Sequence, residues 1–337
     1  METNRSLKIS PYILKLAALL IITILIPVLS LLFGSVSISL NDLFKLFFLG
    51  EGKELTRQVI FEVRLPRVCL AIAVGGGLSV CGAVFQAILM NPLAEPYILG
   101  ISSGAAFGAV LSLVIGAGII ATQIFSFTGA ISVILLVFLF GKRFGELEPN
   151  ILLLSGVMIG AFFAAAILIL VTFLNESLRT AVYWLMGNLS IADSTTSYIV
   201  LPVSIFICFF LMLNGQKYNV LSLGGATAKQ LGINTFVLRN STYILSSLLV
   251  GILVSVSGII GFVGLLVPHV CRMILGVDNR IVIPASFFVG SSFLVFADTI
   301  ARTAIAPSEI PVGAITALIG APIFVYLLRK RFKSAFS

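Results

Sequence analysis

Long apolar stretches alternate with short polar breaks along the whole of this chain. Breaks placed at prolines, glycines and clustered charges leave ten apolar segments, most of them close to the roughly 20 residues that a helix needs to cross a bilayer. Strands of a membrane β-barrel would instead alternate polar and apolar residues over about 10 positions. The pattern predicts an all-α polytopic membrane protein. The predicted spans are 12–33, 64–89, 93–115, 119–141, 150–173, 195–213, 238–258, 261–276, 281–301 and 311–329.

Composition indicates a single transmembrane domain over residues 1–337. Hydrophobic residues make up 59% of the chain and charged residues 10%, whereas soluble domains carry about 25% charged residues. The apolar run from Leu16 to Phe33 is longer than the core of a signal peptide, about 7 to 15 residues, so we expect it to be a retained helix. The cysteines lie singly in or beside apolar stretches, which predicts a packing role: Cys69, Cys81, Cys208 and Cys271.

The net charge of +8 is explained by membrane orientation. In a soluble protein it would suggest a nucleic-acid partner, but here Lys and Arg lie mainly in loops and termini, so none is expected. Ten spans put both termini on one side of the membrane. Placing that side in the cytoplasm assigns 14 Lys and Arg residues to cytoplasmic regions and 7 to the outside, as the positive-inside rule requires.

The chain repeats part of itself at an offset of 176 residues. Residues 74–100 align without gaps to 250–276, with ten identities in 27 positions. The offset equals five predicted spans, an odd number, so the two copies are expected to cross the bilayer in opposite directions, as in many transporters. Pro92 and Pro268 occupy matching positions, and we expect a helix break at each. Backbone groups freed there must be buried in protein or line a cavity.

Four segments resemble the characteristic segments of one transporter family. They are "RLPR" (64–67), "GAVFQAILMNPLAEPYILGISSGAAFGA" (82–109), "GFVGLLVPHVCRMILGVDNR" (261–280) and "EIPVGAITALIGAPIFVYLL" (309–328). The chain is similar to the FecCD-type permease subunits of ABC importers that carry iron chelates (siderophores or haem) or cobalamin. The resemblance implies a type II ABC importer permease fold in a bacterial or archaeal plasma membrane. Nothing in these segments indicates which chelate is carried.

The resemblance also implies partners. Such a permease forms a homodimer in the lipid bilayer, with two cytoplasmic ABC ATPase subunits and an extracytoplasmic substrate-binding protein. The sequence contains no G-x-x-x-x-G-K-[ST], the phosphate-binding loop of such ATPases. We therefore expect ATP and Mg²⁺ to bind to the partner, and this chain to be no enzyme and to hold no cofactor or metal.

A polar loop at 215–240 is the expected ATPase-coupling segment. The resemblance implies short helices along the membrane that insert into a groove of the ATPase; an ordinary amphipathic surface loop is the alternative. Relatives usually carry acidic residues where this chain has "GAT" at 225–227, which favours apolar contact over salt bridges. Within the matching stretch, leucines would anchor the contact and small residues would allow close approach: Leu221, Leu223, Gly224, Ala226, Ala228, Leu231 and Gly232.

Three arginines at the predicted outer ends of spans break the charge trend. In the family, arginines at the places of Arg64, Arg67 and Arg302 face carboxylates of the binding protein. Arg suits this contact because its planar guanidinium binds a carboxylate with two hydrogen bonds. The alternative is that these side chains anchor to lipid headgroups. Asp298 lies one helical turn before Arg302 and can pair with it.

Two constrictions of the pathway are expected from the resemblance. Asn91, Pro92 and Leu93 stand where the family narrows towards the cytoplasm; a ring of Leu93 side chains could close a pore by dewetting, with Asn91 bonding the broken backbone. Pro149 and Asn150 stand at the second constriction, although the small hydroxylated residues usual there are missing.

The remaining residues of the repeated segments are given structural roles: Glu95, Pro96, Pro268, His269 and Arg272. Glu95 precedes a helix start, where its carboxylate can accept backbone N–H bonds. His269 has no Cys or His cluster in sequence that would make a metal site. Trp184 with Tyr183 fits an outer interfacial segment.

An ion-coupled secondary transporter is the alternative function. It would need paired acids near mid-membrane, and this chain offers only Glu95 and Asp298. An intramembrane enzyme would need a catalytic motif such as H-E-x-x-H or G-x-S-x-G, and the sequence has neither. The sequence therefore favours the permease of an importer driven by ATP on its partners.

Overall fold

The computed structural model describes residues 11–34, 36, 38–143, 145–174, 177–190 and 193–335. Each predicted span corresponds to one apolar helix, so the all-α prediction is confirmed. Six helices in the described part are long and apolar enough to cross a membrane, and four shorter apolar helices complete the set. The ten are α1 Pro11–Leu32, α4 Leu65–Ile88, α5 Ile101–Val114, α6 Ile119–Phe140, α7 Pro149–Val171, α9 Ser194–Met212, α12 Thr235–Ser257, α13 Val263–Leu275, α14 Asn279–Thr303 and α15 Val312–Ala335.

Short elements connect these helices. Two short strands, β1 Lys142–Arg143 and β2 Glu146–Leu147, pair antiparallel between α6 and α7. Helix α4 continues an earlier helix that hydropathy did not predict, so one apolar helix runs over Glu54–Ile88. The other short helical elements are α2 Leu40–Phe44, η1 Lys45–Leu49, α3 Glu54–Gln58, η2 Val59–Arg64, η3 Pro96–Leu99, α8 Leu178–Leu185, α10 Gly215–Leu221 and α11 Gly225–Gln230.

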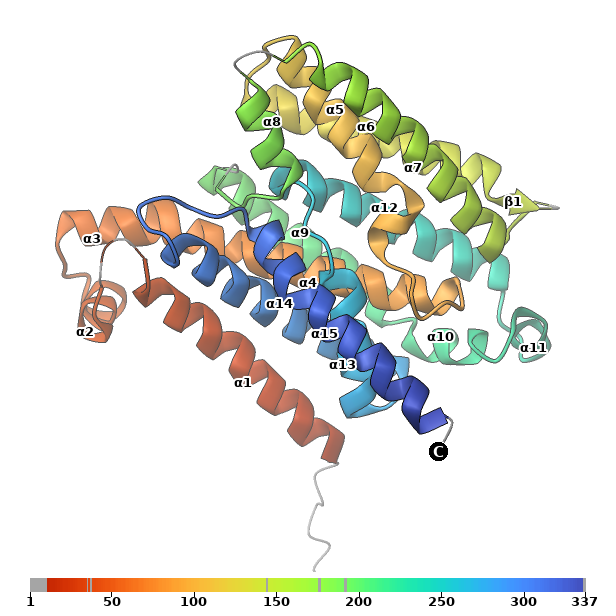
Figure 1. Cartoon of the computed structure of the whole chain (residues 1–337). Coiled ribbons are helices and arrows are strands. Elements are labelled where there is room, and N and C mark those ends of the chain that lie inside the picture. The colour runs from red at the N-terminus through yellow and green to blue at the C-terminus, as the bar shows by residue number, and fades with distance from the viewer. Residues whose placement is uncertain are drawn as a thin grey trace, which may run out of the picture.

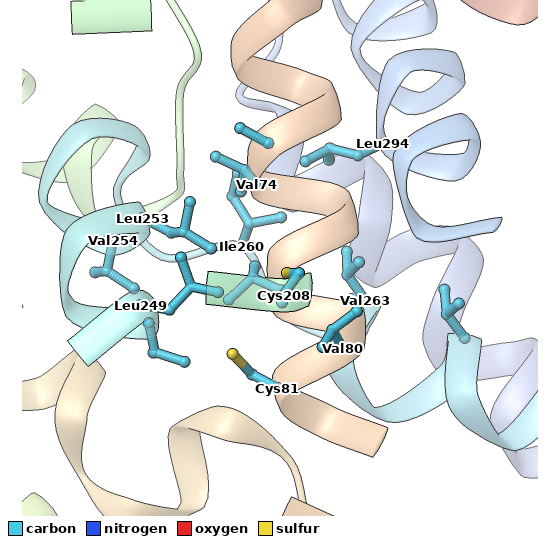
Figure 2. Packing of buried hydrophobic residues seen from close by; sticks show 14 of the residues in the cluster. Val74, Val80, Cys81, Cys208, Leu249, Leu253, Val254, Ile260, Val263 and Leu294 are labelled. Atoms are coloured by element: carbon cyan, nitrogen blue, oxygen red, sulfur yellow. The ribbon is translucent and has the colours of Figure 1, made fainter. Parts of the chain in front are cut away.

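Helix α4 is the centre of the bundle. It contacts α9, α12, α13 and α14, and nearly all of its side chains are buried. Figure 2 shows Val74, Val80 and Cys81 of α4 among apolar side chains of these neighbours. Three of the four cysteines, Cys81, Cys208 and Cys271, are buried and unbonded to one another, which confirms their packing role.

Glycines let the backbones of α4 and its neighbours touch. A Cβ atom placed on Gly82 would lie 1.8 Å from the carbonyl oxygen of Gly264 in α13. One on Gly75 would lie 2.3 Å from the carbonyl oxygen of Gly290 in α14. Helices in lipid gain little from hydrophobic burial against each other, so close van der Waals packing through small residues is a main source of their association.

The outer helices present apolar side chains to the surroundings. Helices α5, α6 and α7 contact one another, and α12 contacts both α4 and α6; Figure 1 shows them on the opposite side of the molecule from α1. Helix α7 is the least buried long span, with Phe162 and Leu168 exposed by 68% and 71%. Such a face suits lipid or a second membrane-embedded chain.

The two copies of the repeat run in opposite directions. Ile88 at the end of α4 and Arg239 near the start of α12 line the same small cavity, so the end of the first copy's leading helix lies beside the beginning of the second's. This confirms the inverted repeat. In Figure 1 the start of α1 and the end of α15 lie at the same end of the bundle, as an even number of spans requires.

The predicted break at Pro268 is wrong. The chain leaves α12 after Ser257 and turns at Gly258 and Phe262, both with left-handed backbone angles (φ +69° and +68°). Pro268 lies buried inside α13. A proline inside a membrane helix is tolerated where neighbours accommodate the backbone, so the turn is set by the residues at 258–262.

The backbone groups at this turn find partners in protein, as expected inside a membrane. The N–H of Ile260 donates to the Tyr97 hydroxyl at 3.2 Å. The N–H of Asn188 donates to the Ser257 carbonyl at 2.8 Å. The turn of the second copy is therefore held by the η3 segment of the first copy and by the loop after α8.

We expect Gly82→Ala to destabilise the crossing of α4 and α13, because the added methyl group would overlap the backbone of Gly264. Overpacking of this kind costs about 1–3 kcal/mol, measurable as a lower Tm of the purified protein in detergent. Gly118→Ala is the matched control, since nothing lies within 4 Å of its Cβ position. Equal Tm values for the two variants would contradict the close contact.

Candidate functional sites at the two ends of the bundle

The loops gather at two opposite ends of the bundle. We call one the α10–α11 end; it comprises residues 89–95, 141–143, 145–148, 213–234 and 276–278. The other, the α8 end, comprises residues 115–118, 177–190 and 304–311. Cavities mark both ends: Pro92, Leu223 and Val277 line one at the α10–α11 end, and Gly118, Tyr183 and Glu309 line one at the α8 end.

Helix α10 is anchored into the bundle. The Tyr218 side chain is fully buried, and its hydroxyl shares a hydrogen bond of 2.9 Å with Thr242 of α12. Leu221 is also fully buried, so the prediction that it anchors the partner ATPase is wrong for this structure. Its apolar side chain packs in the bundle's own core.

Helix α11 and its flanks form an exposed surface. Leu223 and Leu231 are 67% and 62% exposed, and Ala226 is exposed between them. Gly224 and Gly232, with φ of +115° and +81°, turn the chain at the two ends of α11. We call Leu223, Ala226 and Leu231 the α11 surface.

Ala228 faces the other way. It is fully buried, so its small size serves packing inside the chain and gives a partner no access. Lys229 beside it forms an ion pair of 2.8 Å with Glu146 of β2. Both side chains are about half exposed, and exposed pairs stabilise little.

The predicted pathway residues lie at the same end. The Asn91 side-chain oxygen accepts the N–H of Leu93 at 2.9 Å, which confirms that Asn91 bonds the broken backbone after α4. Pro92 forms part of this turn, and Leu93 is 48% exposed. A pore closed by Leu93 stays a prediction.

The second predicted constriction is the start of α7. Pro149 is the first residue of the helix, and the Glu148 carboxylate accepts the N–H of Ile151 at 2.8 Å as its cap. Pro149 is buried and Asn150 is exposed. The contacts explain where α7 begins, while a gating role stays a prediction.

The residues given structural roles pack between the repeat copies. Glu95 precedes η3, but its side chain makes no capping bond, contrary to expectation. Pro96 packs against Gly264, whose Cβ position lies 2.5 Å from the proline ring.

His269 meets Phe324 edge-on at 5.7 Å between ring centroids. Arg272 of α13 donates to the Gln86 oxygen and, at 3.3 Å, to the Ala83 carbonyl of α4.

At the α8 end, the three arginines are buried and bonded within the chain. Arg64 donates to the carbonyl oxygens of Leu31 and Val36. Arg302 donates to the carbonyl and hydroxyl oxygens of Ser30, both at 2.6 Å. These two side chains are 3% and 7% exposed, so Arg64 holds η2 and Arg302 holds α14 to the end of α1 and the residues after it, and neither side chain faces lipid.

Arg67 is the centre of an ion-pair network. It lies 2.8 Å from a carboxylate oxygen of Asp298 and 2.8 Å from one of Glu309, and it donates to the Ser190 hydroxyl at 2.6 Å. Arg302 lies 3.6 Å from Asp298, which confirms the pairing expected from their spacing. The network ties α4 and α14 to the loop after α8 and to the loop before α15.

Docking of a binding protein on these arginines stays a prediction, but the structure changes what docking requires. A partner carboxylate would have to displace Asp298 or Glu309 from Arg67. Glu309 is the accessible one, since it is 41% exposed while Asp298 is 1% exposed. An exchange of carboxylates at Arg67 is therefore the form that docking could take.

Glu309 lies in the loop between α14 and α15. Burial alone would raise the pKa of its carboxyl group, but the hydrogen bonds and charge of Arg67 and the hydrogen bond from Ser190 outweigh it, so the pKa is lowered from its ordinary value of 4.5. The carboxylate form, which holds the two loops to Arg67, is thus favoured.

A cavity of about 620 Å³ opens beside this network. Trp184 of α8 lines it, and its side chain is only 3% exposed, so it packs against protein; its place in an interfacial segment stays a prediction. Arg179 lies over the Tyr183 ring at 5.6 Å. Aromatic, cationic and acidic side chains therefore meet at this cavity.

Comparison with known proteins gives the family. A family model, the FecCD transport family, matches residues 19–330. The chain belongs to the FecCD transport family. It is 35% identical to the vitamin B12 import system permease protein BtuC of Shigella boydii over 94% of both chains. It is 36% identical to the ABC transporter permease protein YvrB of Bacillus subtilis over 89% of both.

Solved structures confirm the fold of this FecCD-family chain. A structure described as an inward-facing conformation of a metal-chelate type ABC transporter is 33% identical, covers 95% of this chain and 99% of its own, and has a TM-score of 0.83. PsaBC from Streptococcus pneumoniae is 16% identical with a TM-score of 0.54 and shares the fold alone. The fold is that of type II ABC importer permeases, as predicted.

Asp298→Asn should strongly destabilise the protein, because it leaves two buried guanidinium groups without a full counter-charge. Breaking a buried ion pair costs about 3–5 kcal/mol, and we expect a clearly lower Tm in detergent. Glu309→Gln removes a carboxylate that is 41% exposed, so its Tm should fall less. A smaller effect for Asp298→Asn than for Glu309→Gln would contradict the network described.

Acidification should weaken the Glu309 contact. A carboxyl group whose folded pKa is lowered stabilises the fold above its unfolded pKa, and this contribution is lost as the pH falls through the folded pKa. Between neutral pH and a pH below the ordinary value of 4.5, Tm should therefore fall more for the parent than for Glu309→Gln. Parallel Tm curves for the two proteins would show that the contact does not contribute.

Proposed function

We propose that this chain is the permease subunit of an ATP-driven importer for an iron chelate (siderophore or haem) or cobalamin. The observation that supports it most directly is the α11 surface: two large apolar side chains, Leu223 and Leu231, stand exposed on either side of a short helix outside the apolar spans of a FecCD-family fold. Exposed apolar anchors on a firmly seated element are what a partner subunit needs to transmit movement.

The seating of this element supports coupling. Helix α10, just before α11, is fixed by the buried side chains of Tyr218 and Leu221. Helix α10 also contacts α14. A force applied to Leu223 or Leu231 would therefore pass to α12 and α14 and from there to α4. Docking on the α11 surface is expected to be apolar, since it carries no acidic side chain.

The nature of the cargo rests on relatives. BtuC is named for vitamin B12 import, and the structure with the TM-score of 0.83 is described as metal-chelate type. Vitamin B12 and metal chelates are both large metal complexes, so we propose this class of compound as the cargo. The proposed assembly is a homodimer with two ATPase subunits, which bind ATP and Mg²⁺, and an external binding protein, in a plasma membrane with both termini cytoplasmic.

An ion-coupled transporter is not favoured by the placement of the acids. Asp298 is held by Arg67 and Arg302 at the α8 end. Glu95 lies in the loop before η3, at the other end of α4. Proton or sodium coupling would use acids close together near mid-membrane, and these two do not meet.

Leu231→Asp should uncouple uptake from ATP, because a carboxylate on the α11 surface cannot be buried against an apolar groove without a large desolvation cost. In proteoliposomes holding the permease, its ATPase and the binding protein, we expect uptake to fall by about tenfold or more while the permease keeps its Tm. Gln230→Asp is the matched control: it adds the same charge at the neighbouring exposed position.

The energy source is tested in the same vesicles. A Walker A substitution in the copurified ATPase should abolish uptake. Normal uptake by Leu231→Asp would refute the docking surface, and uptake by the permease alone on an ion gradient would refute the importer function.

A further inference from the structure

A second cavity, of about 570 Å³, lies at the α10–α11 end. It is enclosed by the end of α4, by α10, by α13 and by the start of α14. The residues that matter here are Gln86, Met90, Asn219, Leu223, Arg272 and Asn279.

Arg272 brings an uncompensated positive charge to this cavity. Its guanidinium donates to the Gln86 side-chain oxygen and to the Ala83 carbonyl, and both acceptors are neutral. Among the described residues, no carboxylate forms an ion pair with Arg272. A largely buried cation without a counter-charge is costly, so an anion entering the cavity would be stabilised there.

Among the described residues that line the cavity, Asp278 is the one acid, and it is already hydrogen-bonded. Asp278 accepts hydrogen bonds from the side chains of Arg280 and Asn219, at 2.7 Å and 2.6 Å. The Arg280 bonds come first among the causes that hold the pKa of Asp278 far below its ordinary value. Its charge is therefore matched by Arg280 and leaves that of Arg272 uncompensated.

Two buried polar atoms beside Arg272 lack partners. The Gln86 oxygen takes the bond from Arg272, which leaves its amide nitrogen as a donor without a partner among the described residues. The side-chain oxygen of Asn279 is a hydrogen-bond acceptor that likewise has no partner among the described residues. These residues are only 4% and 5% exposed, and buried polar groups normally have a partner.

The surroundings of the cavity are apolar and lie where spans end. Met90 and Val277, at its rim, are exposed by 46% and 78%. Helix α4 ends at Ile88 and α13 at Leu275, which places the cavity at the depth of lipid headgroups. A ligand here would meet cationic and amide groups inside and apolar side chains at the rim.

We propose that this cavity binds a phosphate group, and that its source is the phosphodiester of an anionic glycerophospholipid. Arg272 and the Gln86 amide would donate to the phosphate oxygens, and Asn279 would accept from a headgroup hydroxyl. Basic pockets between membrane helices recognise anionic headgroups in this way. The inference rests on the membrane placement of the chain and is independent of the cargo proposed above.

The test is native mass spectrometry of the full chain released from a neutral detergent, with phosphatidylglycerol or phosphatidylcholine added in equal amounts. We expect phosphatidylglycerol to bind more tightly, and Arg272→Gln to lower its affinity by about fivefold or more, the effect of one cation near a membrane surface. Arg272→Lys keeps the charge and should retain most of the preference. Lys229→Gln, at the same end but outside the cavity, should bind as the parent does.

Competition with inorganic phosphate distinguishes the sources. If millimolar phosphate displaces phosphatidylglycerol from the parent and not from Arg272→Gln, the anion site is supported. Free phosphate is then shown to bind to the same site as the lipid headgroup. Equal phosphatidylglycerol affinity of the parent and a folded Arg272→Gln would overturn the proposal, as would a parent that binds the two lipids equally.

Discussion

Inside a bilayer a polar group can bond only to protein, and this constraint governs the bundle. The chain is interrupted twice near the repeat interface. Asn91 closes the turn after α4 locally, by accepting the N–H of Leu93. The turn after α12 depends on the other copy, because Tyr97 of η3 accepts the N–H of Ile260.

The same constraint explains charges that seem misplaced. Arginines at the α8 end run against the positive-inside trend, but their side chains are buried in protein and do not face lipid. Arg64 and Arg302 satisfy carbonyl oxygens around the end of α1, and Arg67 holds two carboxylates. The ion-pair network around Arg67 therefore holds helices together, and Glu309 is its most accessible carboxylate.

The α10–α11 end combines firm seating with exposure. Leu221 and Ala228 are buried, while Leu223 and Leu231 are exposed a few residues away. This arrangement is what the proposed coupling requires. The buried residues pack against the bundle, and the exposed leucines are accessible to a partner. Beside it lies Arg272, whose charge is matched by no described carboxylate.

The features that could be predicted from the amino-acid sequence are those that depend on near neighbours in the chain. Hydropathy placed all ten spans because an apolar run must be long enough to cross the bilayer. The four-residue spacing predicted the Asp298–Arg302 pair, and the family resemblance predicted that Asn91 bonds the broken backbone near it. Three features became evident only from the packing of the helices. These are which leucines of 221–231 face outward, where the second repeat turns, and that Asp298 pairs mainly with Arg67, 231 residues away. These depend on which helices meet in space, and neither hydropathy nor local spacing records that.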